Sequence, residues 1–80
     1  MYSVYLLRSK INSKKTYIGF TTDLHQRLES HNSGNSVHTA DFRLWQLVAY
    51  VCFDTKLKAM EFEKYLKVGS GHAFARRHLW

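Results

Sequence analysis

Residues 17–34 read YIGFTTDLHQRLESHNSG, and this stretch decides the fold because a strand, a turn and a helix follow one another in it. Thr16 to Phe20 is rich in β-branched and aromatic residues, which favour a strand. Thr21 to Asp23 supplies side-chain oxygens that can cap a helix, and Gly34 is typical of the position just after one. We therefore expect a helix that runs to about Asn32.

A second strand is expected upstream. Tyr2 to Leu7 (YSVYLL) has strand composition, and the polar segment Arg8 to Lys15 separates it from the strand that begins at Thr16. Two short strands around such a loop predict an antiparallel hairpin. A hairpin would bring Tyr5 and Tyr17 close together.

Downstream of the first helix, Asn32 to Asp41 shows no periodicity and is expected to be a loop. Trp45 to Phe53 (WQLVAYVCF) is the longest strand-like run, and we expect it to be the central strand. Cys52 is the only cysteine and lies in this apolar run, so we expect a buried, inert thiol and no disulfide.

Two further helices complete the expected order. Asp54-Thr55 can cap a helix from Lys56 to about Val68, which Gly69-Ser70-Gly71 would end, and residues 72–80 can form a short terminal helix. The order β-β-α-β-α-(α) predicts an α+β fold, with a small mixed or antiparallel three-stranded central sheet flanked by helices. We expect one domain over residues 1–80.

The charge balance is basic, with 12 Lys and Arg against 6 Asp and Glu and a formal charge of +6. Such a surface suits a phosphate backbone, although solubility alone explains it equally well. No apolar stretch reaches the length of a membrane span and no signal peptide pattern is present, so we expect no membrane contact and a cytoplasmic location.

The first expected helix carries two polar side chains beside its apolar stripe. At about 100° per residue, Leu24 and Leu28 define the core-facing side, and Arg27 and His31 fall at its edge, one turn apart. Both side chains would point at the body of the domain. The alternative is a snorkelling arginine and a hydrogen-bonded histidine without chemistry.

The second expected helix has an apolar stripe made of Ala59, Phe62 and Leu66. Glu63 lies on the margin of this stripe, whereas Glu61 faces solvent. A carboxylate held at the edge of a core can serve as a metal ligand. The alternative is an ion pair between Glu63 and Lys67, one turn away.

Tyrosines in strands are ordinarily packing residues, and a phenol is a poor base unless a cation or a metal lowers its pKa. Arg27 and a metal on Glu63 would supply that lowering. Gly19 interrupts a strand pattern, and close approach of a ligand to the backbone is one reason for a glycine there. The five histidines lack the paired spacing of a zinc site.

The ordered set Val4-Tyr5, Tyr17-Ile18-Gly19, Arg27, His31 and Glu63 resembles the GIY-YIG nuclease superfamily. The likeness spans nearly the whole chain and is strongest to the small stand-alone bacterial type, which is related to the catalytic domains of structure-selective resolvase subunits and excision-repair nucleases. Three departures stand out: Ser3 begins the first motif, His72 stands where an arginine is common, and the usual proline-containing turn before the third strand is missing.

The resemblance implies catalytic roles for Tyr5, Tyr17, Arg27, His31 and Glu63. One tyrosine would help deprotonate water while the other positions phosphate or water, and which does which stays open. Arg27 would stabilise phosphorane charge, His31 would assist proton transfer or contact phosphate, and Glu63 would be the sole carboxylate on one Mg²⁺ or Mn²⁺. Cleavage would leave a 5′-phosphate and a 3′-hydroxyl.

The implied substrate is DNA, single-stranded or branched, with RNA left open and a protein partner or a homodimer also possible. Candidate nucleic-acid contacts are Gly19, Thr21, Asn32, Thr39, Lys67 and Arg76. Asn32 and Thr39 could instead cap loops, and Trp80 could pack or stack on a base. The alternatives to an endonuclease are a nucleic-acid-binding module that does not cut and a nuclease subunit that depends on a partner.

Overall fold

The computed structural model describes residues 1–36 and 38–80 and contains one antiparallel three-stranded sheet. Its strands are β1 (Tyr2–Ser9), β2 (Thr16–Thr21) and β3 (Trp45–Phe53), in the spatial order β2-β1-β3. Both pairings of β1 are antiparallel. The expected hairpin, the α+β class and the order of the elements are confirmed.

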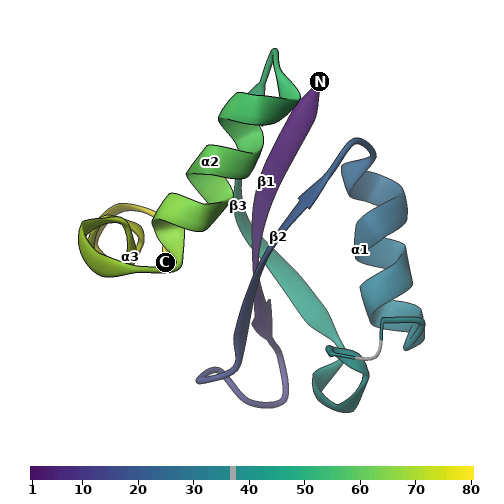
Figure 1. Cartoon of the computed structure of the whole chain (residues 1–80). Coiled ribbons are helices and arrows are strands. Elements are labelled where there is room, and N and C mark those ends of the chain that lie inside the picture. Colours follow the sequence, from purple (N-terminus) through teal and green to yellow (C-terminus); the bar gives the residue numbers. More distant parts are fainter. Residues whose placement is uncertain (37) are drawn as a thin grey trace.

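The helices cover the sheet from opposite sides (Figure 1). On one face, α1 (Leu24–Ser33) packs its leucines against Tyr5, Leu7 and Trp45. On the other face, α2 (Lys56–Leu66) and α3 (Gly69–His78) pack against Val4 and Leu6. Side chains of β1 alternate between the two faces, so this one strand supplies residues to both halves of the core.

The expectation that Trp45 to Phe53 is the central strand was wrong, because β1 holds that place and β3 lies at an edge. Five consecutive residues of β1, from Ser3 to Leu7, are buried, as a strand covered on both faces requires. The apolar run of β3 is mostly half-buried or exposed. The thiol of Cys52 is accordingly exposed rather than buried, and its Sγ lies 3.2 Å from Ser3 Oγ.

The helix caps follow the sequence closely. The Asp23 carboxylate accepts a hydrogen bond from the Gln26 backbone at 3.1 Å, and Gly34 ends α1 in the left-handed region with a φ of 86°. Thr55 caps α2 by accepting from the Lys58 backbone at 3.3 Å. Among the described residues, no helix is long and apolar enough to cross a membrane.

Contrary to the expectation, the glycines after α2 do not end this helix near Val68 but belong to the next helix. Helix α2 ends at Leu66, and α3 already begins at Gly69. A Cβ on Gly71 would overlap the carbonyl oxygen of Tyr65, so this glycine lets α3 pack directly on the end of α2.

The loop expected from Asn32 to Asp41 begins later, because α1 extends to Ser33. The short 3-10 helix η1 (Ala40–Phe42) forms its far end. Residue 37 lies outside the described residues.

Candidate active site

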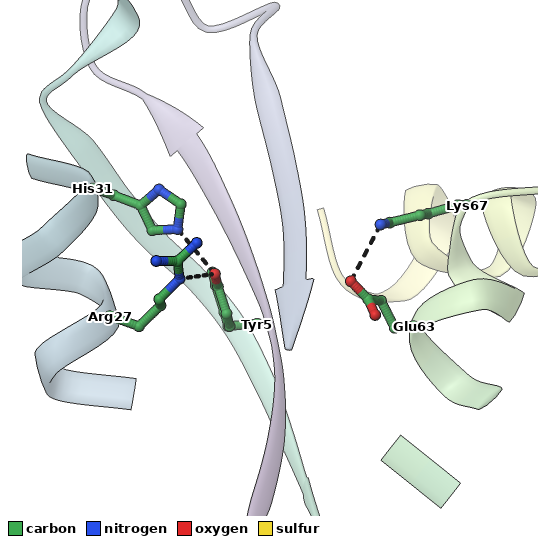
Figure 2. Close-up of polar contacts among 5 residues, drawn as sticks. All are labelled: Tyr5, Arg27, His31, Glu63 and Lys67. Atoms are coloured by element: carbon green, nitrogen blue, oxygen red, sulfur yellow. Dashed lines mark hydrogen bonds and ion pairs between the residues drawn. The ribbon is translucent and has the colours of Figure 1, made fainter. Parts of the chain in front are cut away.

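A buried hydrogen-bonded cluster links β1 to α1 (Figure 2). The Tyr5 side chain is 1% exposed, and its hydroxyl lies 2.9 Å from His31 Nε2. Arg27 Nε donates to the same hydroxyl oxygen at 3.2 Å. The two α1 residues that sequence periodicity placed beside the apolar stripe therefore meet on one phenol.

The direction of each hydrogen bond in this cluster follows from its chemistry. Arg27 can only donate, so the Tyr5 oxygen accepts from it and the Tyr5 hydroxyl hydrogen is left for His31 Nε2. A neutral His31 must then carry its proton on Nδ1, which lies 2.7 Å from Thr39 Oγ1. The Thr39 hydroxyl in turn donates to the Ser36 carbonyl at 3.5 Å. One ordered chain of donors thus runs from Arg27 to Ser36.

Burial keeps His31 neutral. Its side chain is fully buried, and this desolvation, reinforced by the positive charge of Arg27, lowers the pKa of His31 to about 4. Burial also raises the pKa of Tyr5, and the nearby Tyr17 and Glu63 raise it further, while the hydrogen bond and charge of Arg27 oppose the shift. Tyr5 is therefore a protonated phenol and His31 a neutral imidazole at physiological pH.

These pKa values decide what His31 can do for Tyr5. Transfer of the phenol proton to His31 would run from a group whose pKa burial raises above its ordinary value to one whose pKa is lowered to about 4. The proton therefore stays on the phenol, which holds it far more tightly than the imidazole would. His31 thus orients the Tyr5 hydroxyl and does not deprotonate it.

Tyr17 lies beside this cluster, on the edge strand β2. Its ring centroid is 4.9 Å from that of His31 and 6.2 Å from that of Tyr5. Unlike Tyr5, it is only half-buried. The two tyrosines do come together as the hairpin predicts, but only Tyr17 is open to solvent.

Gly19 makes room for this arrangement. It lies directly opposite Tyr5 in the β1–β2 pairing, and a Cβ there would overlap the Tyr5 hydroxyl and lie 2.8 Å from Tyr17 Cε2. The close neighbour of the Gly19 backbone is therefore the tyrosine pair and not a ligand. Because Gly19 is itself buried, the expected nucleic-acid contact at this residue gains no support.

Glu63 does not lie within the tyrosine cluster. It projects from α2 on the far side of strand β2, where Lys67 Nζ lies 3.2 Å from its Oε2 (Figure 2). The ion pair considered as an alternative is thus present. The carboxylate is nevertheless near enough to raise the pKa of Tyr5. Glu61, as expected, is exposed to solvent.

The donor set around Glu63 fits a hard divalent cation with a largely hydrated coordination sphere. Within residues 1–36 and 38–80, no cluster of three His, Cys, Asp or Glu side chains could enclose a metal. Magnesium does not require such a cage, because it keeps several waters and often takes one carboxylate plus substrate phosphate oxygens. The Glu63 side chain is 24% exposed. Its Oε2 is paired with the ammonium of Lys67, which a cation can displace.

The other expected nucleic-acid residues are dispersed. Thr21 and Arg27 line a hollow of about 210 Å³ at the start of α1. Lys67 lines a second hollow, of about 230 Å³, where β2, α2 and α3 meet. Arg76 lines a third, of about 570 Å³, along α3. Thr21, Lys67 and Arg76 therefore do not share one surface depression.

Asn32 and Thr39 hold the loop after α1 and have internal partners. The Asn32 amide binds the Trp45 backbone, donating to its carbonyl at 3.3 Å and accepting from its N–H. Thr39 is 1% exposed, and its carbonyl accepts from Trp45 Nε1 at 2.9 Å. Because Thr39 is buried, the expected nucleic-acid contact at this residue gains no support; its hydroxyl instead lies within hydrogen-bond distance of His31. No periodicity in the sequence links residues 31 and 39.

Comparison with known proteins identifies the fold. The family model described as the GIY-YIG catalytic domain matches residues 1–73. The chain is 36% identical over 85 aligned positions to the structure-specific endonuclease subunit SLX1 of Debaryomyces hansenii, covering 98% of this chain and 23% of that protein.

Two bacterial relatives are shorter proteins. The UPF0213 protein YsiG of Lactococcus lactis is 42% identical over 67 residues, which is 82% of this chain and 62% of that protein. The UPF0213 protein YazA of Bacillus subtilis is 39% identical over 64 residues, covering 79% and 63% of the two chains. The chain thus spans about a quarter of the yeast protein and less than two thirds of the bacterial ones. Because the family model matches residues 1–73 of the 80, the chain belongs to the GIY-YIG family of nuclease domains.

Proposed function

We propose that this domain is an endonuclease that hydrolyses DNA phosphodiester bonds with the help of one divalent metal, Mg²⁺ or Mn²⁺. The observation that carries the proposal is the cluster in which Arg27 and His31 hold the Tyr5 hydroxyl beside Tyr17. Packing of the core alone does not require that an arginine and a histidine both bind the hydroxyl of one buried tyrosine. Glu63 across β2 adds the carboxylate that a metal needs.

The proposed division of labour assigns water activation to Tyr17. Tyr5 is buried, protonated and engaged by two hydrogen bonds, so it cannot take a proton from solvent. Tyr17 is half-exposed and lies close to the guanidinium of Arg27. Tyr17, once deprotonated, would accept a proton from water as the water oxygen attacks phosphorus. The bond from phosphorus to the 3′ oxygen would break, and that oxygen would take a proton from solvent, leaving a 5′-phosphate and a 3′-hydroxyl.

Arg27 and Glu63 would act on the phosphate from opposite sides of β2. Arg27 lines the hollow of about 210 Å³ and has donors beyond the Nε that binds Tyr5, so it can hold phosphate oxygens as negative charge builds. Glu63 would hold the cation, which supplies charge neutralisation at the leaving oxygen when bound. Tyr5 and His31 would keep the Arg27 side chain in place.

The substrate we favour is single-stranded or branched DNA, with RNA as the other polymer to be tested. The name of the yeast relative, a structure-specific endonuclease subunit, supports a structural rather than a sequence preference. It also supports action within a complex, either with a partner or as a homodimer. A small domain offers limited surface for reading base sequence. A cytoplasmic location stays a prediction.

Cleavage assays test the proposal directly. Single-stranded, duplex and branched DNA and single-stranded RNA are incubated with the protein in Mg²⁺, Mn²⁺ or EDTA. We expect cutting of single-stranded or branched DNA with either metal and none in EDTA. Glu63→Gln should abolish cutting, whereas Glu61→Gln, two residues away on the exposed side of the same helix, should cut normally.

Three outcomes separate the alternatives. Salt-sensitive binding without cleavage under every condition would replace the proposal with a binding module. Cleavage that appears only after addition of a partner would favour a dependent subunit. Cleavage retained by Glu63→Gln would show that the metal is held elsewhere.

A further inference from the structure

A second nucleic-acid subsite is suggested by the hollow of about 230 Å³ on the α2–α3 side of the sheet. Its lining combines an apolar floor with a polar rim: Thr16, Ile18, Leu66, Lys67, His72 and Trp80. None of these lining residues has a carboxylate side chain. The Arg8 guanidinium lies over one face of the Trp80 ring, 5.6 Å from its centroid, and donates to the Trp80 backbone oxygen at 3.0 Å, so a base would stack on the opposite face.

The lining fits one kind of ligand. A flat aromatic group can pack against Trp80 and Ile18, while an attached anion meets Lys67 and His72 at the rim. The hollow beside Arg27, by contrast, is lined by Thr21, Asp23, Gln26, Arg27 and Ser30, so it suits a phosphate but offers a base nothing to stack on.

Its position ties this hollow to the candidate active site. Lys67 at its rim is the residue paired with Glu63 at 3.2 Å. Thr16 and Ile18 belong to β2, the same edge strand that carries Tyr17. A nucleic-acid strand with its scissile phosphate at Glu63 and Tyr17 would then pass this hollow with a neighbouring nucleotide. The larger hollow along α3 has aromatic and basic residues too, but its lining shares no residue with the site.

We propose that this hollow, hereafter the Trp80 pocket, binds one unpaired nucleotide that flanks the cleaved bond, with its base stacked on Trp80 and its phosphate on Lys67. The inference rests on the proposed nuclease function and deepens it. A base inserted here cannot remain stacked and paired in a duplex, so the pocket selects single strands and frayed or branched ends over intact duplex.

Lys67 would connect the pocket to the metal. In the structure its ammonium neutralises Glu63. A divalent cation on Glu63 would displace that ammonium, which then becomes free to bind the phosphate of the pocketed nucleotide. Lys67→Gln should therefore tighten the binding of Mn²⁺ alone and weaken the binding of nucleic acid.

Binding measured in EDTA tests base stacking in the pocket without any cleavage, because Lys67 stays paired with Glu63 when no cation is present. A short fluorescein-labelled oligothymidylate and a matched duplex are titrated with wild-type protein and with Trp80→Ala. Because base stacking carries much of single-strand affinity, we expect about a tenfold loss for the single strand and little change for the duplex. Tyr50→Ala, which removes an exposed aromatic side chain from β3, serves as the matched control and should bind normally.

Trp80→Phe keeps the result interpretable if the alanine variant folds poorly. It should retain single-strand affinity, because phenylalanine also stacks. Oligothymidylate should quench the tryptophan emission of the wild type but not of this variant, since the remaining Trp45 is 4% exposed. Wild-type affinity in a folded Trp80→Ala, equal losses for duplex and single strand, or quenching that persists in Trp80→Phe would each overturn the pocket. Failure to cleave would count against the nuclease proposal alone.

Discussion

Tyr5 and His31 share a buried hydrogen bond of 2.9 Å that ties the central strand to the first helix. Both side chains are almost completely excluded from solvent. The bond leaves the Tyr5 oxygen free to accept from Arg27 and leaves the second nitrogen of His31 free to donate to Thr39. The conformation of the candidate catalytic arginine is therefore set from within the core.

The neutral state of His31 predicts a specific loss of stability in acid. Its pKa of about 4 in the folded protein lies below the ordinary value of 6.5. On acidification, the His31 imidazole therefore takes up a proton in the unfolded chain before it does so in the folded protein. The free energy of unfolding should fall as pH drops through about 6.5 and level off near 4, by at most about 3 kcal/mol. Urea unfolding at a series of pH values across this range measures the loss of unfolding free energy.

The matched variant for this prediction is His31→Gln, which keeps one acceptor and one donor but does not titrate. Its free energy of unfolding should change less between pH 6.5 and 4 than that of the wild type. Parallel pH profiles for the two proteins would mean that His31 does not control acid stability.

Thr39→Val is predicted to disturb His31 without changing the volume of the side chain. Valine leaves the Nδ1 proton of His31 without an acceptor in the core, which should cost about 1 to 3 kcal/mol. Nitrogen NMR of the wild type should show His31 protonated on Nδ1. Thr39→Ser should restore both stability and this tautomer. An Nε2-protonated wild type would contradict the hydrogen-bond directions.

How far the sequence could predict this site depends on periodicity. Arg27 and His31 are one helical turn apart, so their common direction was predictable, and the hairpin paired Tyr5 with Tyr17. The contact between Thr39 and His31 could not be predicted, because the sequence between the two residues has no periodicity.

The sheet order was missed for a related reason. The long apolar run of β3 predicts a central strand, whereas the shorter run of β1 is the one buried on both faces. A run of apolar residues reports hydrophobicity but not how many faces of a strand are covered, which depends on where the helices pack. The exposure of Cys52 follows from the same error.

Gly19→Ala tests the close packing of the tyrosine pair. The added methyl group would occupy the position of the Tyr5 hydroxyl, so Tyr5 must move and its hydrogen bonds to Arg27 and His31 must break or lengthen. We expect a loss of about 1 to 3 kcal/mol in unfolding free energy, as in other overpacked cores, together with reduced cleavage.

Gly69→Ala is the comparison variant for this overpacking. A Cβ at Gly69 meets no atom within 4 Å, although its φ of 52° disfavours alanine. Its penalty should be limited to about 1 kcal/mol of backbone strain, with cleavage retained. Equal effects of the two variants on cleavage would mean that the Tyr5 position is unimportant for catalysis.

The most direct test of the central claim is the single-turnover cleavage rate of Tyr17→Phe on single-stranded or branched DNA in Mg²⁺, with thermal unfolding as a check on folding. The account assigns water activation to the half-exposed Tyr17 beside Arg27. It therefore predicts a rate at least about a hundredfold below wild type in a normally folded protein. Cleavage by Tyr17→Phe at the wild-type rate would contradict it.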